Sequence, residues 1–251
     1  MKTLADLEDE MYRLISEAQK EDIFLRVIGG LAIKIHSPHA NHHALAREYP
    51  DIDFVTNKSG ARKLGDFLSR MGYTPNKTFN TLSGDRRQLY YDEPRNRQID
   101  VFIGDFTMCH TLPLADRLHV EPVTIPLSEL FLSKAQIVEL NRKDALDLLT
   151  LLIDHKAGHG DDETINTDIV AGLCAKNWGL YTTVSMTIEK LLALLEDGEI
   201  ELEETLAQAV KERLNFIQQA MDAVPKGLSW KMRDKIGKRV RWYEEVEEVQ
   251  R

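Results

Sequence analysis

The first half of the chain alternates between helical and strand-like spacing of its apolar residues. Leucine, methionine and isoleucine recur at helical spacing between residues 3 and 20, which predicts an amphipathic helix. The apolar run over residues 23–28 that follows is short and rich in branched side chains, as in a buried strand. It stops at Gly29 and Gly30, after which apolar residues up to Ile35 favour a short helix. The chain therefore begins with a helix, a strand, a glycine turn and a second helix.

Later segments of the first half predict the rest of a sheet. The apolar and polar pattern favours strands over residues 51–55, 73–80, 88–91, 98–103 and 120–125. Between the first two, Asn57 is placed to cap a helix that runs to Met71, with its apolar residues on one face. This half is predicted to be α+β, a mixed β-sheet with flanking helices.

From Leu127 onward the spacing of apolar residues is helical almost throughout. Asn141 is placed to cap one of these helices. We therefore predict a catalytic or binding domain over residues 1–126 and a helical C-terminal bundle over residues 127–251. The expected helices cover residues 127–139, 142–155, 164–174, 183–196, 202–224 and 230–249.

Three aspartates interrupt the predicted strands. Asp51 and Asp53 alternate with apolar residues, so strand geometry directs both to one face. Asp100 is the single acid in the apolar run over residues 97–103. Clustered carboxylates repel one another, and hard divalent cations with oxygen ligands offset that repulsion. The pattern predicts a site for two Mg²⁺ ions; acids on edge strands that face water are the alternative.

Gly29 and Gly30 join the first predicted strand to a helix. Glycine lets backbone N–H groups approach an anion at the start of a helix, which favours a phosphate contact, although a purely structural turn would have the same sequence. A phosphate cradle beside metal-binding acids indicates chemistry on a nucleoside triphosphate.

At Gly29-Gly30, Asp51-Ile52-Asp53 and Asp100 the chain resembles the nucleotidyltransferase superfamily typified by DNA polymerase β. It looks most similar to minimal bacterial enzymes of the abortive-infection toxin type (AbiEii-like, from toxin–antitoxin systems), and more distantly to antibiotic adenylyltransferases. The resemblance covers roughly residues 20–155. Two differences stand out: Leu31 stands where many relatives have serine, and residues 37–50 form an insertion before the acids.

The resemblance implies roles for these residues. Asp51 and Asp53 would bind two Mg²⁺ ions, for which Mn²⁺ is a substitute, and Asp100 would bind one and help activate the attacking hydroxyl. Gly29 and Gly30 would contact the nucleotide. Two cations stand where relatives contact the triphosphate, Arg47 and Lys134; a surface arginine and a lysine at the edge of the core are the alternatives.

Composition limits the partners. The formal net charge is −9 over 251 residues, which argues against a protein that coats extended nucleic acid. The net charge does not exclude a local basic groove formed by the arginines between Arg86 and Arg97. The N-terminal residues lack the apolar core of a signal peptide, no apolar run approaches a membrane span, and Cys109 and Cys174 form no disulfide framework, so we expect a cytoplasmic protein with no membrane contact.

Several histidines lie close together in the sequence, but their pattern does not predict a second metal site. No cysteine or glutamate in the pattern completes a ligand set with them, so solvated loop histidines are the expectation rather than a zinc site. The residues are His36, His39, His42, His43, His155 and His159.

The sequence therefore predicts a Mg²⁺-dependent nucleotidyltransferase that moves a nucleoside monophosphate from a nucleoside triphosphate to a hydroxyl and releases pyrophosphate. The acceptor stays open among a small molecule, a tRNA or other RNA end, and a protein side chain. Two alternatives remain: a non-catalytic nucleotide-binding or interaction protein, and a hydrolase that uses the same acids on a phosphoester.

Overall fold

The computed structural model describes residues 2–246, which form two compact units. The first unit holds the chain up to Ala32 together with residues 48–106 and 113–126. The second unit begins again at Leu127, and it also includes residues 33–47 and 107–112. These two stretches fall within the predicted first domain of residues 1–126, but they contain elements that pack on helices of the second unit.

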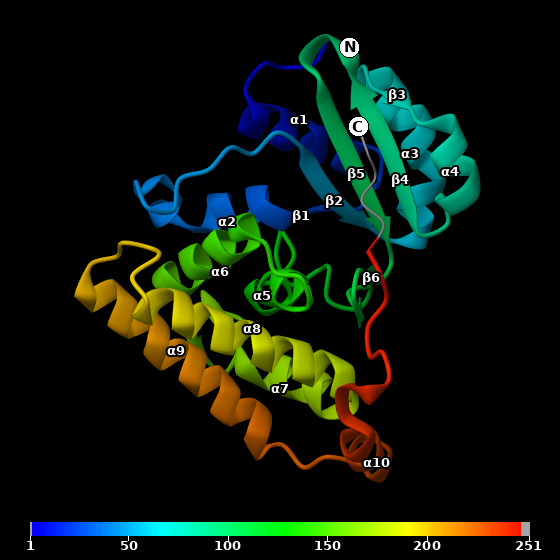
Figure 1. The fold of residues 1–251 in the computed structure, drawn as a ribbon. Coiled ribbons are helices and arrows are strands. Elements are labelled where there is room, and N and C mark those ends of the chain that lie inside the picture. The colour runs from blue at the N-terminus through cyan, green and yellow to red at the C-terminus, as the bar shows by residue number, and fades with distance from the viewer. Residues whose placement is uncertain (1, 247–251) are drawn as a thin grey trace. The chain divides into compact units, whose positions relative to one another are not determined.

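A five-stranded mixed sheet forms the centre of the first unit, and the predicted α+β class is confirmed (Figure 1). Its order is β1-β2-β5-β4-β3, with β2 and β5 parallel and the other neighbours antiparallel. The strands are β1 (Leu25–Ile28), β2 (Ile52–Thr56), β3 (Thr74–Pro75), β4 (Arg87–Asp92) and β5 (Arg97–Ile103).

Three helices flank this sheet, and side-chain caps begin each of them (Figure 1). They are α1 (Leu7–Lys20), α3 (Lys58–Met71) and α4 (Lys77–Ser83). The predicted cap of α3 is confirmed, because the Asn57 side chain accepts a hydrogen bond from the Gly60 N–H. Between α1 and α3, Arg13 donates to the Met71 carbonyl, which ties the two helices together.

Two strand predictions of the first half are wrong. The expected strand over residues 73–80 stops at Pro75, because the Asn76 side chain accepts from the Phe79 N–H and begins α4. The expected strand near residues 120–125 is only one isolated parallel bridge between Thr124 and Val27.

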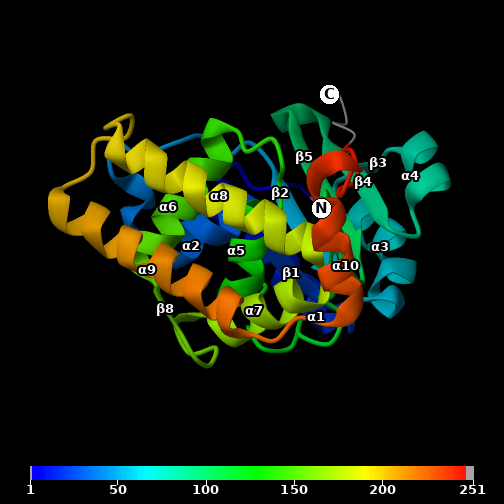
Figure 2. The ribbon, with the colours of Figure 1, turned by 60° about the horizontal axis from the view of Figure 1, so that its bottom comes forward.

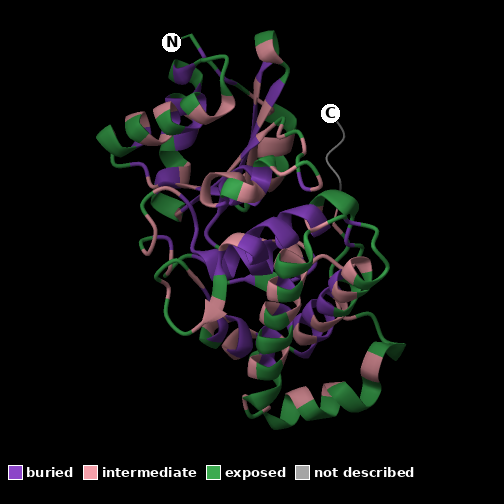
Figure 3. Ribbon diagram, turned by 90° about the vertical axis from the view of Figure 1, so that its left-hand side faces the viewer, coloured by how far each residue is buried: buried purple, intermediate pink, exposed green. Residues whose placement is uncertain are grey.

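The second unit is mainly helical, as predicted (Figure 2). Leu127–Ala135 (α5) and the leucine-rich α6 (Arg142–Asp154) lie largely buried at its centre (Figure 3). The Asn141 cap of α6 is confirmed, since its side chain accepts from the Asp144 N–H. The remaining long helices, which pack on one another, are α7 (Thr167–Lys176), α8 (Trp178–Glu196) and α9 (Glu204–Ala223).

Short elements complete the chain. Helix α2 (Gly29–His36) follows β1 directly, and the 3₁₀ turn η1 (Pro38–Asn41) lies in the insertion. In the second unit β8 (Lys156–Gly158) pairs in parallel with β9 (Thr164–Asn166). The other short elements are η2 (Glu93–Arg95), β6 (Phe106–Thr107), β7 (Thr111–Leu112), α10 (Leu228–Ile236) and η3 (Gly237–Arg239).

The C-terminal helix is shorter than predicted. Helix α10 ends at Ile236 because Gly237 adopts a positive φ of 61°, which breaks the helical conformation. The predicted helix to residue 249 is wrong over residues 237–246, and its last three residues lie outside the described part of the chain. Within residues 2–246, no helix is both long and apolar enough to span a membrane.

Candidate active site

The register of the sheet places Asp53 and Asp100 side by side. On the parallel strands β2 and β5, these two residues are direct partners. The row continues to Ile28 of β1 and to Leu89 of β4, so the two carboxylates are flanked by apolar residues on one face of the sheet. The apolar neighbours Ile52 and Phe54 project from the opposite face and are fully buried. The predicted convergence of acids from separate strands is therefore present for this pair.

Asp51 immediately precedes β2, two residues before Asp53 in the chain. Its carboxylate accepts a hydrogen bond from the backbone N–H of Gln98, with the two atoms 3.2 Å apart. The negative charge of Asp51 contributes to raising the pKa of Asp100, so the two groups are electrostatic neighbours. The first unit thus brings all three predicted carboxylates to one region of the sheet.

Asp100 is buried and paired with an arginine of the neighbouring strand. The Arg87 Nε donates to both carboxylate oxygens of Asp100, at 2.8 and 2.9 Å, and its Nη2 contacts Oδ2. Burial raises the pKa of Asp100, and the Arg87 guanidinium opposes that shift. The same guanidinium lies over the rings of Phe102 and Phe79. The sequence analysis noted a basic stretch here but did not identify Arg87 as a site residue.

The glycine turn lies directly against Asp53. Gly29 begins α2 with a φ of 78°, a backbone conformation that favours glycine. A Cβ atom at this position would lie only 2.6 Å from Oδ2 of Asp53. Both Gly29 and Gly30 are buried, so the start of the helix and the Asp53 carboxylate are packed together without space for a side chain.

The charges of this region fit a divalent cation. Asp51, Asp53 and Asp100 bring three negative charges, and Arg87 offsets one of them. The pKa of Arg87 is raised despite burial because both Asp100 and Asp53 stabilise its charged form. The remaining carboxylate oxygens are ligands of the type that Mg²⁺ and Mn²⁺ prefer.

The two predicted triphosphate contacts lie in the second unit, where Asp147 engages both. Arg47 Nε and Nη2 each donate to Asp147 at 2.7 Å, and Lys134 Nζ lies 3.1 Å from the same carboxylate. Lys134 also donates to Asp144 at 2.6 Å. Burial lowers the pKa of Lys134, but the two carboxylates outweigh it and the net shift is upward. In this structure the two cations form a buried charge network.

Three of the four arginines of the basic stretch over residues 86–97, which the net charge did not exclude as a groove, bind groups within the first unit. Arg97 is buried and donates to the backbone carbonyls of Leu4 and Ala5. Arg95 donates to the Thr3 hydroxyl at 2.7 Å. Together with Arg87, these arginines have partners inside the first unit.

No family model and no curated protein matches the chain. Among solved structures, the chain is similar to that of the antibiotic-resistance factor ANT(2'')-Ia, with 11% identity, 78% of this chain and 99% of that one covered, and a TM-score of 0.41. It is also similar to a protein of H. pylori provisionally assigned as a nucleotidyltransferase, with 14% identity, 90% and 100% coverage, and a TM-score of 0.42. Likeness at this level does not establish a family, so the functional argument depends on the site itself.

Proposed function

We propose that the protein is a nucleotidyltransferase that transfers a nucleoside monophosphate from a nucleoside triphosphate to a hydroxyl acceptor and releases pyrophosphate. The observation that carries the proposal is the pairing of Asp53 with Asp100 in register on parallel strands, with Asp51 as an electrostatic neighbour of Asp100 and Gly29 packed against Asp53. Packing alone does not require three carboxylates in this position, because their mutual repulsion opposes folding.

Asp51, Asp53 and Asp100 would hold Mg²⁺, or Mn²⁺ in its place. When bound, the metal would offset the charge on the attacking and leaving oxygens of the displacement at the α-phosphorus. The backbone at the start of α2 would orient the triphosphate, and the buried carboxylate of Asp100 would hold a fixed position beside the reacting groups.

The carboxylate of Asp100 is also suited to take the proton of the acceptor hydroxyl. Burial raises its pKa, which makes it a better proton acceptor than an exposed aspartate, while Arg87 holds both of its oxygens in place. Arg47 and Lys134 stay proposed triphosphate contacts, and such a role requires each to leave its pairing with Asp147 in part. The proposal includes two further points: the enzyme is of the abortive-infection toxin type, and its acceptor is a small molecule, an RNA end or a protein side chain.

The test is a labelling experiment with α-labelled nucleoside triphosphates, Mg²⁺ and candidate acceptors. We expect pyrophosphate release and labelled product with the wild-type chain, and loss of about 10³-fold or more in rate for Asp53→Asn and Asp100→Asn. Asp66→Asn is the matched control, because Asp66 is exposed on α3.

The outcomes separate the alternatives. Release of inorganic phosphate without label transfer would identify a hydrolase. Nucleotide binding that gives no turnover with any acceptor, and that is unchanged in Asp100→Asn, would favour a non-catalytic nucleotide-binding protein. Equal rates for wild type and Asp53→Asn would overturn the role of the carboxylates.

A further inference from the structure

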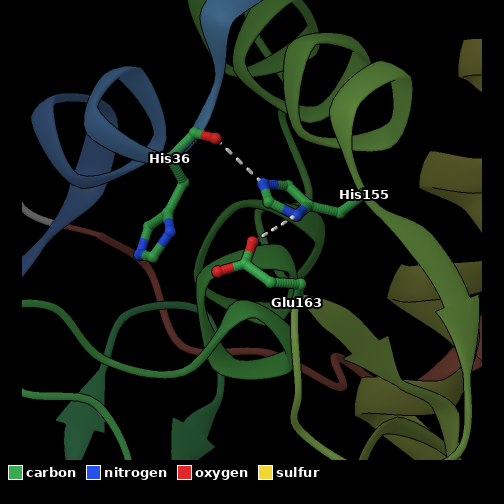
Figure 4. A group of neighbouring side chains, drawn as sticks. All are labelled: His36, His155 and Glu163. Carbon is green, nitrogen blue, oxygen red and sulfur yellow. Dashed lines mark hydrogen bonds and ion pairs between the residues drawn. The ribbon is translucent and has the colours of Figure 1, made fainter.

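A second group of metal-ligating side chains lies in the second unit and shares no residue with the carboxylate site. His36 at the end of α2, His155 after α6 and Glu163 before β9 come together, each offering one ligand atom, and these atoms all lie within 4.8 Å of one another (Figure 4). They come from distant parts of the sequence: His36 and His155, which are hydrogen-bonded to each other, are 119 residues apart. The sequence analysis missed Glu163 because nothing in its local pattern marks it as a partner of the histidines.

Hydrogen bonding fixes the orientation of the His155 ring. Its Nε2 lies 3.1 Å from the backbone carbonyl oxygen of His36. A carbonyl oxygen only accepts, so Nε2 must carry the hydrogen. In the neutral imidazole the lone pair is then on Nδ1. A ring nitrogen held in this way by a carbonyl is the usual arrangement of a histidine that binds a metal through its other nitrogen.

The other nitrogen of His155 faces a carboxylate. Nδ1 lies 3.6 Å from Oε2 of Glu163, as the dashed line in Figure 4 shows. A lone pair and a carboxylate oxygen are both acceptors, so their approach calls for a cation or a proton between them. His36 lies beside the same carboxylate, so a second imidazole is within reach of a cation held there.

We propose that His36, His155 and Glu163 bind one transition-metal ion, of which Zn²⁺ is the best fit. Two imidazole nitrogens and one carboxylate oxygen are three of the four ligands of a tetrahedral zinc site, and water would supply the fourth.

The distances suit this ion after a small adjustment. With metal–ligand bonds of about 2.0–2.1 Å, the ligand atoms of a tetrahedral site lie roughly 3.3 Å apart. The separation of 3.6 Å between His155 and Glu163 is close to that value. All ligand atoms lie within 4.8 Å of one another, and the exposed side chain of Glu163 can rotate towards the two imidazoles. Burial of His36, helped by His155, lowers its pKa, so its ring is neutral and able to coordinate at pH 7.

The ion would join three segments of the second unit. His36 ends α2, His155 follows α6, and Glu163 ends the loop that connects β8 to β9. Zinc binding is therefore expected to stabilise this part of the fold, and the proposal does not depend on the proposed nucleotidyl transfer.

The experiment uses the full chain after treatment with a chelator. Zn²⁺ is titrated calorimetrically with Mg²⁺ in excess to compete at the carboxylates, and Co²⁺ is added separately to record the visible absorption of a tetrahedral site. We expect one Zn²⁺ per chain and a melting temperature that rises with zinc concentration.

Glu163→Gln is the main variant, because its exposed side chain can be changed without a cavity. It should weaken zinc affinity by more than the roughly 10- to 100-fold that loss of an outer-shell partner produces, and abolish the cobalt spectrum. His159→Gln is the matched control, since His159 is exposed in the same loop and faces Asp168 instead. Equal zinc affinity in wild type and Glu163→Gln would overturn the proposal, as would the absence of zinc binding by wild type. Pyrophosphate release by Glu163→Gln should match wild type, so failure here is distinct from failure of the proposed function.

Discussion

Replacement of Arg87 by methionine tests the electrostatic balance of the carboxylate site. The substitution keeps an apolar stem over Phe102 but removes the guanidinium from Asp100. Loss of one partner from a buried ion pair costs about 3–5 kcal/mol in the free energy of unfolding. The Arg87 side chain is 23% exposed and that of Asp100 only 4%, so we expect the lower end of this range, about 3 kcal/mol.

The loss should depend on pH with a defined sign. Without Arg87, burial and the charge of Asp51 still raise the pKa of Asp100, and nothing opposes them. The folded state then binds a proton more tightly than the unfolded state, where an aspartate has a pKa of about 3.9. Stability of the variant relative to wild type is therefore lowest at neutral pH and recovers as the pH falls through the folded pKa towards the unfolded one.

Urea denaturation with chelator or with Mg²⁺ measures both effects. Magnesium should stabilise Arg87→Met more than wild type, because a divalent cation can take the place of the missing charge. Arg86→Met is the control, since Arg86 is the exposed neighbour of Arg87. A free energy of unfolding within about 0.5 kcal/mol of wild type, the range of ordinary surface changes, would refute the reasoning.

Two further substitutions test other parts of the structure. Gly29→Ala should lower stability by about 1–3 kcal/mol because of its positive φ, and it should also reduce activity through contact with Asp53. Gly104 has a similar φ of 76°, but a Cβ there would have no atom of the described residues within 4 Å. Equal activity of Gly29→Ala and Gly104→Ala would contradict the contact. Lys134→Met should lower stability by about 3 kcal/mol, measured by denaturation, because the buried Asp147 and the half-buried Asp144 lose a cation. The exposed Lys143→Met should have little effect, and equal losses in the two variants would contradict the charge network.

Much of the order of elements in the first half could be predicted because local residue preferences and packing agree there. The alternation of polar and apolar residues around Asp51 and Asp53 predicts strand β2, and Asn57 predicts the start of helix α3; the chain forms both. The segment over residues 73–80 misled because its aromatic and threonine residues favour a strand, while the side chain of Asn76 starts a helix. That asparagine was the signal available in the sequence.

The convergence of Asp53 and Asp100 was predicted in outline, but its details depend on pairing that no local pattern contains. Arg87 reaches Asp100 diagonally across antiparallel strands, a relation that the register of β4 and β5 sets. The position of Glu163 beside the histidines was harder to predict, because its backbone has a positive φ of 45° in an irregular loop. Such a conformation has no reliable signature in the residue type.

Because Asp53 and Asp100 are direct partners on neighbouring strands, the site depends on the number of residues in each strand as well as on which residues they are. Deleting one residue within β5 before Asp100 would shift every later side chain by one position and turn that aspartate towards the apolar interior. Insertions in the loop before β4 leave the alignment of β2 with β5 unchanged. Evolution of this chain can therefore vary its loops widely while the spacing within these two strands stays fixed.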